Sequence, residues 1–202
     1  MRDKNPYRKP DQHTKAAKAA GYPARSVFKL EEIHRRCRLF RPGQSVVDLG
    51  AAPGSWSLFV QKQLGRKGRL LSIDLNPLEI TLAPSATVIV GDALDPALVA
   101  YEDHGPFDVV LSDMAPLTSG NRDSDQARSF ELVMRAIVVA AVHGAPGSSF
   151  VAKIFMGPDY EEARRELRKL YADVRTLRPD TVRKNSTEVF LVGLNKTARE
   201  SI

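Results

Sequence analysis

The chain has 202 residues, of which 43% are hydrophobic and 27% charged, a balance typical of one globular domain. A single cysteine, Cys37, excludes an internal disulfide framework and a cysteine-based zinc cluster. The longest apolar run, residues 136–142, is far shorter than the roughly 18 residues that a membrane-spanning helix needs. Because the first twenty residues also lack the apolar segment of a secretory signal, we expect a soluble, cytoplasmic protein.

The net charge of +6 is concentrated at the N-terminus. Residues 1–41 contain 12 Lys or Arg and 4 Asp or Glu, whereas residues 42–202 contain 18 and 20. A basic segment on a nearly neutral body favours a phosphate-rich partner such as nucleic acid, because Lys and Arg release counterions condensed on phosphates. The alternative is a solvated terminus that only aids solubility.

The same basic segment contains one predicted helix. Its apolar side chains recur at helical spacing, at Val27, Leu30, Ile33 and Cys37, and this face is expected to pack on the rest of the molecule. Lys29 lies off that face. We therefore expect residues 1–41 to form a basic N-terminal extension with one helix.

From residue 42 onward, apolar runs alternate with helical patterns, which is typical of a mostly parallel sheet covered by helices. Strands are expected at Ser45–Leu49, Arg69–Leu75, Thr87–Val90, Phe107–Ser112, Ser149–Phe155 and Val189–Leu194, with a further strand at Asp173–Leu177. Helices are expected at Ser55–Leu64, Leu94–Tyr101, Ser124–His143 and Asp159–Tyr171. No internal repeat or linker interrupts this pattern, so residues 42–202 are expected to form one domain.

The strongest local signal is the segment Asp48–Trp56, with the sequence DLGAAPGSW, in which a buried strand runs through a small-residue turn into a helix. Ligands bind at such turns in open α/β sheets. Only Gly50 and Gly54 are glycines, so the turn differs from the G-x-G-x-x-G cradle for a dinucleotide and from a Walker loop. Small residues let the backbone approach a ligand closely, and a nucleoside with a short polar tail fits this turn.

Carboxylates follow the next strands. Asp74 ends the second strand, 20 residues after Gly54, where it can accept hydrogen bonds from ribose hydroxyls. Asp92 follows the third strand and suits an exocyclic amine, and Asp113 ends the fourth. Each aspartate alone could simply form a turn or cap a helix. Their occurrence at successive strand ends favours a ligand site.

The segment Asp48–Trp56 is similar to the cofactor motif of class I S-adenosylmethionine-dependent methyltransferases, and more narrowly it resembles the FtsJ/RrmJ family of RNA ribose 2′-O-methyltransferases. The resemblance continues through residues 24–30, 112–116, 151–155 and 186–190, and covers nearly the whole chain beyond residue 15. It implies a Rossmann-like α/β fold with a seven-stranded, mostly parallel sheet and helices on both faces. It also implies S-adenosyl-L-methionine as the cofactor, bound by Gly50, Gly54, Trp56, Asp74, Asp92 and Asp113. From the sequence alone, a tryptophan at this position is more often a core residue at the start of a helix than a wall of a ligand site.

Family members share a Lys-Asp-Lys-Glu catalytic tetrad, which is matched here by Lys29, Asp113, Lys153 and Glu188. A ribose 2′-hydroxyl is a poor nucleophile and needs activation. Lys153 is the candidate base, with Lys29 as a neighbouring charge and the two carboxylates orienting the amines. Alternatively, Lys153 stays protonated and stabilises the developing alkoxide. A purely structural role is hard to reconcile with its apolar neighbours, because an unpaired buried ammonium is costly.

The resemblance implies that the substrate is structured RNA, in particular the uridine of the A-loop in large-subunit ribosomal RNA. The expected partner is ribosomal RNA or the large ribosomal subunit, and we expect a monomer that binds no membrane. The four histidines show no metal-ligand spacing, so no metal is expected. Two alternatives remain, methylation of a tRNA anticodon loop and a non-catalytic RNA-binding module that keeps the fold. The Ser-Asp-Met-Ala-Pro sequence at residues 112–116 favours oxygen over nitrogen as the methyl acceptor.

Overall fold

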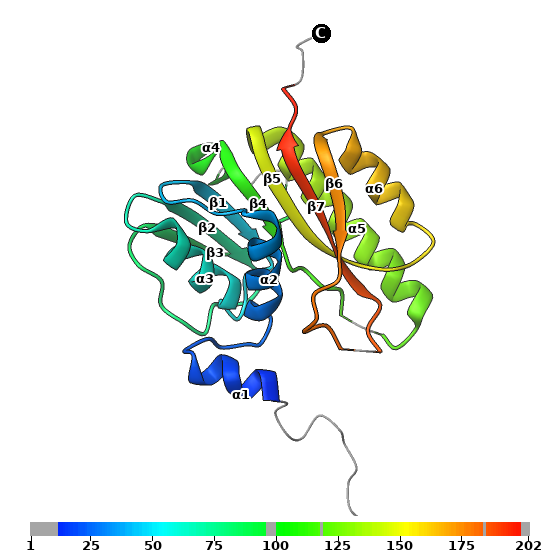
Figure 1. The fold of residues 1–202 in the computed structure, drawn as a ribbon, viewed down its shortest axis with the longest axis horizontal. Coiled ribbons are helices and arrows are strands. Elements are labelled where there is room, and N and C mark those ends of the chain that lie inside the picture. Colours follow the sequence, from blue (N-terminus) through cyan, green and yellow to red (C-terminus); the bar gives the residue numbers. More distant parts are fainter. Residues whose placement is uncertain (1–11, 96–99, 118, 184, 199–202) are drawn as a thin grey trace, which may run out of the picture.

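The computed structural model describes residues 12–95, 100–117, 119–183 and 185–198, which fold around one seven-stranded sheet of order β3-β2-β1-β4-β5-β7-β6 (Figure 1). β7 runs antiparallel to both of its neighbours, β5 and β6, and the other neighbouring strands pair in parallel. The strands are β1 (Ser45–Leu49), β2 (Arg69–Asp74), β3 (Ala86–Val90), β4 (Phe107–Ser112), β5 (Gly144–Phe155), β6 (Tyr171–Leu177) and β7 (Glu188–Lys196). The helices are α1 (Gln12–Ala19), α2 (Val27–Cys37), α3 (Ser55–Leu64), α4 (Ala100–His104), α5 (Arg122–His143) and α6 (Tyr160–Arg168). The predicted α/β fold is confirmed.

Each face of the sheet has its own hydrophobic core. On one face, residues such as Leu30, Val60 and Phe190 pack between the sheet and α1, α2 and α3. On the other, residues such as Ile137 and Phe150 pack between the sheet and α4, α5 and α6. Figure 1 shows α2 and α3 in front of the sheet and α5 behind it. Burying each large apolar side chain contributes about 1.5–3 kcal/mol, which holds the three layers together.

The N-terminal extension contains two helices, so the prediction of a single helix there is wrong. The predicted helix is α2, in which Val27, Leu30 and Ile33 are fully buried while Lys29 is only partly buried. The unpredicted helix is α1, whose only buried residue is Ala17. Its sequence QHTKAAKA has no apolar stripe, so periodicity could not reveal it. Residues 1–11 of the extension lie outside the described residues.

Two predicted helices extend over residues that are not helical, and a third, α5, begins at Arg122, two residues before the predicted start. The expected helix at Leu94–Tyr101 is wrong at its start, because Asp92 Oδ1 accepts the Leu94 N–H at 2.8 Å and forms a turn there. The helix observed in this region is α4, which begins at Ala100 beyond the undescribed residues 96–99. Further along, α6 ends at Arg168 instead of Tyr171, because Tyr171 is already the first residue of β6.

The sheet topology brings the predicted site residues to one edge. The chain runs from β1 outward through β2 to β3, and then returns to the other side of β1 to form β4. The carboxyl ends of these parallel strands lie at the same edge, and the reversal between β1 and β4 creates a crevice there. The turn after β1, Asp74, Asp92 and Asp113 all follow or end these strands.

Candidate active site and cofactor site

The turn between β1 and α3 requires both of its glycines. Gly50 has φ +76° and Gly54 has φ +112°, a region that L side chains rarely adopt. A Cβ atom on Gly50 would lie 2.7 Å from Met114 Cγ, and one on Gly54 would lie 2.6 Å from Ile80 Cγ1. The Gly50 N–H also donates to the Ile73 carbonyl of β2 at 2.9 Å. The turn is therefore a fixed backbone surface without side chains at these two points.

Asp74 both shapes this turn and faces the same edge. Its Oδ2 accepts the Ala52 N–H at 2.9 Å, and its Oδ1 accepts the Asn76 N–H at 2.8 Å. Asp74 Oδ1 also accepts from Asn76 Nδ2 at 3.3 Å. A carboxylate can accept about four hydrogen bonds, so Asp74 keeps capacity for one ribose hydroxyl without giving up a present partner. Asp92 is exposed after β3 and has one oxygen bound to the backbone of Leu94. Both predicted carboxylates thus lie at adjacent strand ends and also form turns.

The Trp56 side chain lies in the core. The prediction that Trp56 lines the cofactor site is therefore wrong for its indole ring. Trp56 is only 2% exposed, and its Nε1–H donates to the Ser26 carbonyl at 2.9 Å. The ring packs against Phe190, with 5.9 Å between centroids. This side chain ties α3 to α2 and β7, and only its backbone at the start of α3 is left to approach a ligand.

The four tetrad residues lie on one side of the sheet. Strand side chains alternate between faces, so Asp113 shares a face with Leu111, Lys153 with Val151, and Glu188 with Phe190. Those three apolar neighbours belong to the core beneath α2 and α3. Lys29 comes from α2, which covers this same face. Strand alternation and helix position together bring four distant segments to one place.

Within the tetrad, the charges form two ion pairs. Lys153 Nζ donates to the backbone oxygen of Asp113 at 2.5 Å and to its Oδ1 at 2.9 Å. Lys29 Nζ lies 2.5 Å from Glu188 Oε1. Phe190 lies between the two pairs. It is the β7 residue opposite Lys153, and its ring centroid lies 5.8 Å from Lys29 Nζ. All four side chains are between 7% and 18% exposed, so these charges are held at the margin of the protein interior.

A buried polar network beneath the turn escaped the sequence analysis. Ser57 Oγ on α3 donates to Asp48 Oδ2 at 2.6 Å, and Ser72 Oγ on β2 donates to Ser57 Oγ at 3.0 Å. Complete burial raises the pKa of the Asp48 carboxyl from 3.8 to about 7, helped by the charges of Asp113 and Asp74 and opposed by the Ser57 hydrogen bond. The signal available in the sequence was an aspartate inside an otherwise apolar strand.

The described part of the chain contains no cluster of three or more His, Cys, Asp or Glu residues arranged to hold a metal ion. Among the same residues, no helix is long and apolar enough to cross a membrane.

Comparison with known proteins identifies the family. Residues 22–196 match the model of the FtsJ-like methyltransferases. The chain belongs to the FtsJ-like methyltransferase family. A relative from Sorangium cellulosum, named ribosomal RNA large subunit methyltransferase E, is 57% identical over 198 residues, which cover 98% of this chain and 93% of the relative. The matched region includes both ion pairs and the glycine turn.

Solved structures confirm the fold of this FtsJ-like chain. A protein from Plasmodium falciparum, described as a ribosomal RNA methyltransferase, superposes with a TM-score of 0.78 at 23% identity and covers 88% of this chain and 100% of its own. Fibrillarin from Aeropyrum pernix, solved with natively bound S-adenosyl-L-methionine, gives a TM-score of 0.55 at 14% identity, covering 76% of this chain and 67% of its own. At these identities, both show the class I methyltransferase fold alone.

Proposed function

We propose that this FtsJ-like methyltransferase transfers the methyl group of S-adenosyl-L-methionine to a ribose 2′-hydroxyl of large-subunit ribosomal RNA, with the A-loop uridine as its target. The observation that carries the proposal is the pair of lysine–carboxylate contacts, Lys153–Asp113 and Lys29–Glu188, at the strand edge that also bears the glycine turn. The name of the Sorangium relative supports the large-subunit RNA as acceptor. The A-loop uridine rests on the family resemblance.

The residues at the strand edge fit the cofactor. Asp74 would accept from a ribose hydroxyl of the nucleoside, and Asp92 from its exocyclic amine. The turn from Gly50 to Gly54, which packs closely against Met114 and Ile80 at its two glycines, would lie beside the amino-acid part, and Asp113 lies next to it. When bound, the cofactor supplies a methyl group on a sulfonium centre. The protein has to bring a hydroxyl oxygen in line with that methyl group.

The contacts of Lys153 indicate how the hydroxyl is held. An ammonium has three N–H donors, and Lys153 uses two of them on Asp113. The third is available for an incoming ribose oxygen. This geometry favours a role in which Lys153 orients the 2′-oxygen and stabilises the negative charge that develops on it, while the proton leaves to solvent. The Lys29–Glu188 pair, across Phe190, would place a second donor and acceptor on the ribose.

The proposal is tested by labelled-methyl transfer from S-adenosyl-L-methionine to unmodified large subunits, free large-subunit RNA and tRNA, assayed in parallel. We expect label in the large-subunit RNA, presented free or in subunits, and none in tRNA. Label in tRNA alone would support the anticodon-loop alternative and contradict the proposal. Binding of RNA without transfer to any of the three would instead support a non-catalytic module.

A further inference from the structure

Five exposed cations gather at the edge of the sheet opposite the active site. Arg38 and Arg41 lie between α2 and β1, and Arg66, Lys67 and Arg69 lie between α3 and the start of β2. Both connections enter parallel strands at their amino ends, so they are at the far end of the strands from Asp74 and Asp113. We call these five residues the basic edge.

The basic edge is one rigid surface. The Gly43 N–H donates to the Leu64 carbonyl at 2.9 Å, and the Arg69 N–H donates to the Gln44 carbonyl at 2.9 Å, so the two connections are hydrogen-bonded to each other. Beneath them, Phe40 packs against Phe59 of α3, with 6.1 Å between ring centroids. The cations are therefore carried on two braced turns at the ends of core elements.

None of the five cations forms an ion pair within the described residues. The charge balance differs on α6, where three glutamates lie among the cations, and where Arg164 pairs with Glu161 and Lys169, just after the helix, with Glu166. A helix with mixed charges neutralises itself and needs no partner. Unneutralised like charges on a rigid surface repel one another, and an anionic partner would relieve that repulsion.

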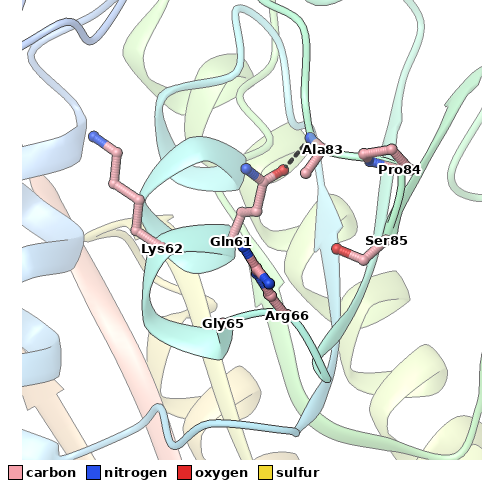
Figure 2. Close-up of a pocket in the computed structure, with 7 residues that line it drawn as sticks. All are labelled: Gln61, Lys62, Gly65, Arg66, Ala83, Pro84 and Ser85. Atoms are coloured by element: carbon pink, nitrogen blue, oxygen red, sulfur yellow. Dashed lines mark hydrogen bonds between the residues drawn. The ribbon is translucent and has the colours of Figure 1, made fainter.

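A pocket opens beside Arg66 within this surface, between the C-terminal end of α3 and residues 83–85. It has a volume of about 480 Å³ and is lined by Gln61, Lys62, Gly65, Arg66, Ala83, Pro84 and Ser85 (Figure 2). Gln61 Oε1 accepts the Ala83 N–H at 2.6 Å and fixes its wall. A guanidinium and a hydroxyl beside the apolar wall of Ala83 and Pro84 suit a sugar–phosphate unit.

We propose that the basic edge binds the phosphate backbone of the same structured RNA whose target nucleotide enters the active site. This inference rests on the proposed function. The five residues of β1, at about 3.3 Å each, separate the two edges by roughly 17 Å. An RNA fragment that contains only the target loop would fill the active site and leave the basic edge empty. A folded RNA domain would reach both edges and bind more tightly, through additional phosphate contacts.

A charge-neutralised variant tests this inference. Arg66→Gln, Lys67→Gln and Arg69→Gln are combined, and the matched control combines Arg165→Gln, Arg168→Gln and Lys169→Gln on α6, which removes the same charge. Kd is measured over a series of KCl concentrations for a folded large-subunit RNA domain, for assembled large subunits and for a short target-loop oligonucleotide. We expect the basic-edge variant to bind the folded domain roughly tenfold more weakly, with a salt slope lower by about 2. Its affinity for the oligonucleotide and the affinities of the control should match wild type.

Methyl transfer and cofactor affinity are measured in the same samples, which keeps the two hypotheses apart. Absence of transfer by the wild-type chain contradicts the proposed function. Wild-type transfer, combined with an unchanged affinity of the basic-edge variant for the folded domain, contradicts only the role of the basic edge. A loss of affinity for assembled subunits but not for free RNA assigns the surface to a ribosomal protein and overturns the RNA contact. An unchanged Kd for the cofactor shows that the variant is folded.

Discussion

Lys153 is a cation within the apolar part of β5, residues 150–155, and is only 7% exposed. Withdrawing an ammonium from water costs several kcal/mol unless oxygen acceptors replace the lost hydration. Asp113 supplies two such acceptors, one from its backbone and one from its carboxylate. A hydrophobic residue of similar size would pack on this strand at a lower cost, and the proposed role of Lys153 in methyl transfer accounts for the charge.

Replacing this lysine tests its role. We expect Lys153→Ala to lower the single-turnover rate of methyl transfer by at least about 10²-fold, because the donor to the ribose oxygen is lost. Cofactor affinity, measured by calorimetry, should stay within a few fold of wild type, since the glycine turn and Asp74 are untouched. Lys169→Ala, on the exposed face of α6, serves as the control. A Lys153→Ala enzyme that turns over at the wild-type rate would remove Lys153 from the mechanism.

Asp48 makes the stability of the protein depend on pH. Its pKa is about 7 in the folded protein, against 3.8 for an ordinary aspartate. The folded state binds the Asp48 proton more tightly than the unfolded state. The stabilisation that this proton gives to the fold is therefore fully present below pH 3.8 and is lost as pH rises toward 7. In that interval the slope is about 1.4 kcal/mol per pH unit.

Asp48→Asn, which stays neutral at every pH, isolates this effect. We predict that the free energy of unfolding of wild type, relative to that of Asp48→Asn, falls steadily as pH rises from 4 to 7. Urea unfolding of both proteins at each pH measures this difference, and all other titrating groups cancel in it. If the free energies of unfolding of the two proteins changed with pH in parallel, the pKa of Asp48 would not be raised in the folded protein.

Among the elements, we expect the turn between β1 and α3 to control whether the cofactor can approach. Gly50 and Gly43 both have positive φ, +76° and +85°, but only a Cβ at Gly50 would meet another residue, Met114. Alanine at either position costs about 1 kcal/mol of backbone strain. We expect Gly50→Ala also to lower cofactor affinity at least about tenfold, because it displaces the backbone beside Asp113.

Calorimetric titration of Gly50→Ala and Gly43→Ala with S-adenosyl-L-methionine measures this difference. The two variants carry the same kind of strain, so their comparison isolates the close approach at the turn. Equal affinities in both variants would show that the turn does not contact the cofactor.

Elements with a strong apolar pattern were predictable, and those set by local hydrogen bonds were not. Apolar runs gave the positions of all seven strands, including β3, which has no fully buried residue, and β6, which has one. The start of β5 was placed too late, at Ser149 instead of Gly144, because the segment between them is small and polar. The turn formed by Asp92 and the polar helix α1 likewise depend on contacts that an apolar pattern does not reveal.

The members of the site were identified by resemblance, but their pairing was not predictable. The contact of Lys153 with Asp113 depends on the register of β4 and β5, and that of Lys29 with Glu188 on how α2 sits over β7. The Asp48 network joins three elements through two serines that carry no distinctive motif. Trp56 was assigned to the cofactor because the motif includes it, whereas its side chain is used for packing.

In the whole molecule, the two proposed binding surfaces lie at opposite ends of the strands. The carboxyl edge carries the glycine turn and the two ion pairs, and the amino edge carries five cations that form no ion pair with the residues that the structure describes. The basic character noted in residues 1–41 therefore continues into the turn after α3, across a hydrogen-bonded boundary. A compact domain that acts on one nucleotide of a large folded RNA would bind that RNA more tightly if a second surface, distant from the active site, also contacted it.

The most direct test of methyl transfer to a ribose hydroxyl is alkaline hydrolysis of the labelled large-subunit RNA. Alkali cleaves RNA through the free 2′-hydroxyl, so a 2′-O-methylated nucleotide stays joined to its 3′ neighbour. We predict that all enzyme-dependent label migrates as a single alkali-stable dinucleotide whose first residue is uridine. Label in mononucleotides would mean that a base was methylated, and would contradict the chemistry assigned to Lys153 and its partners.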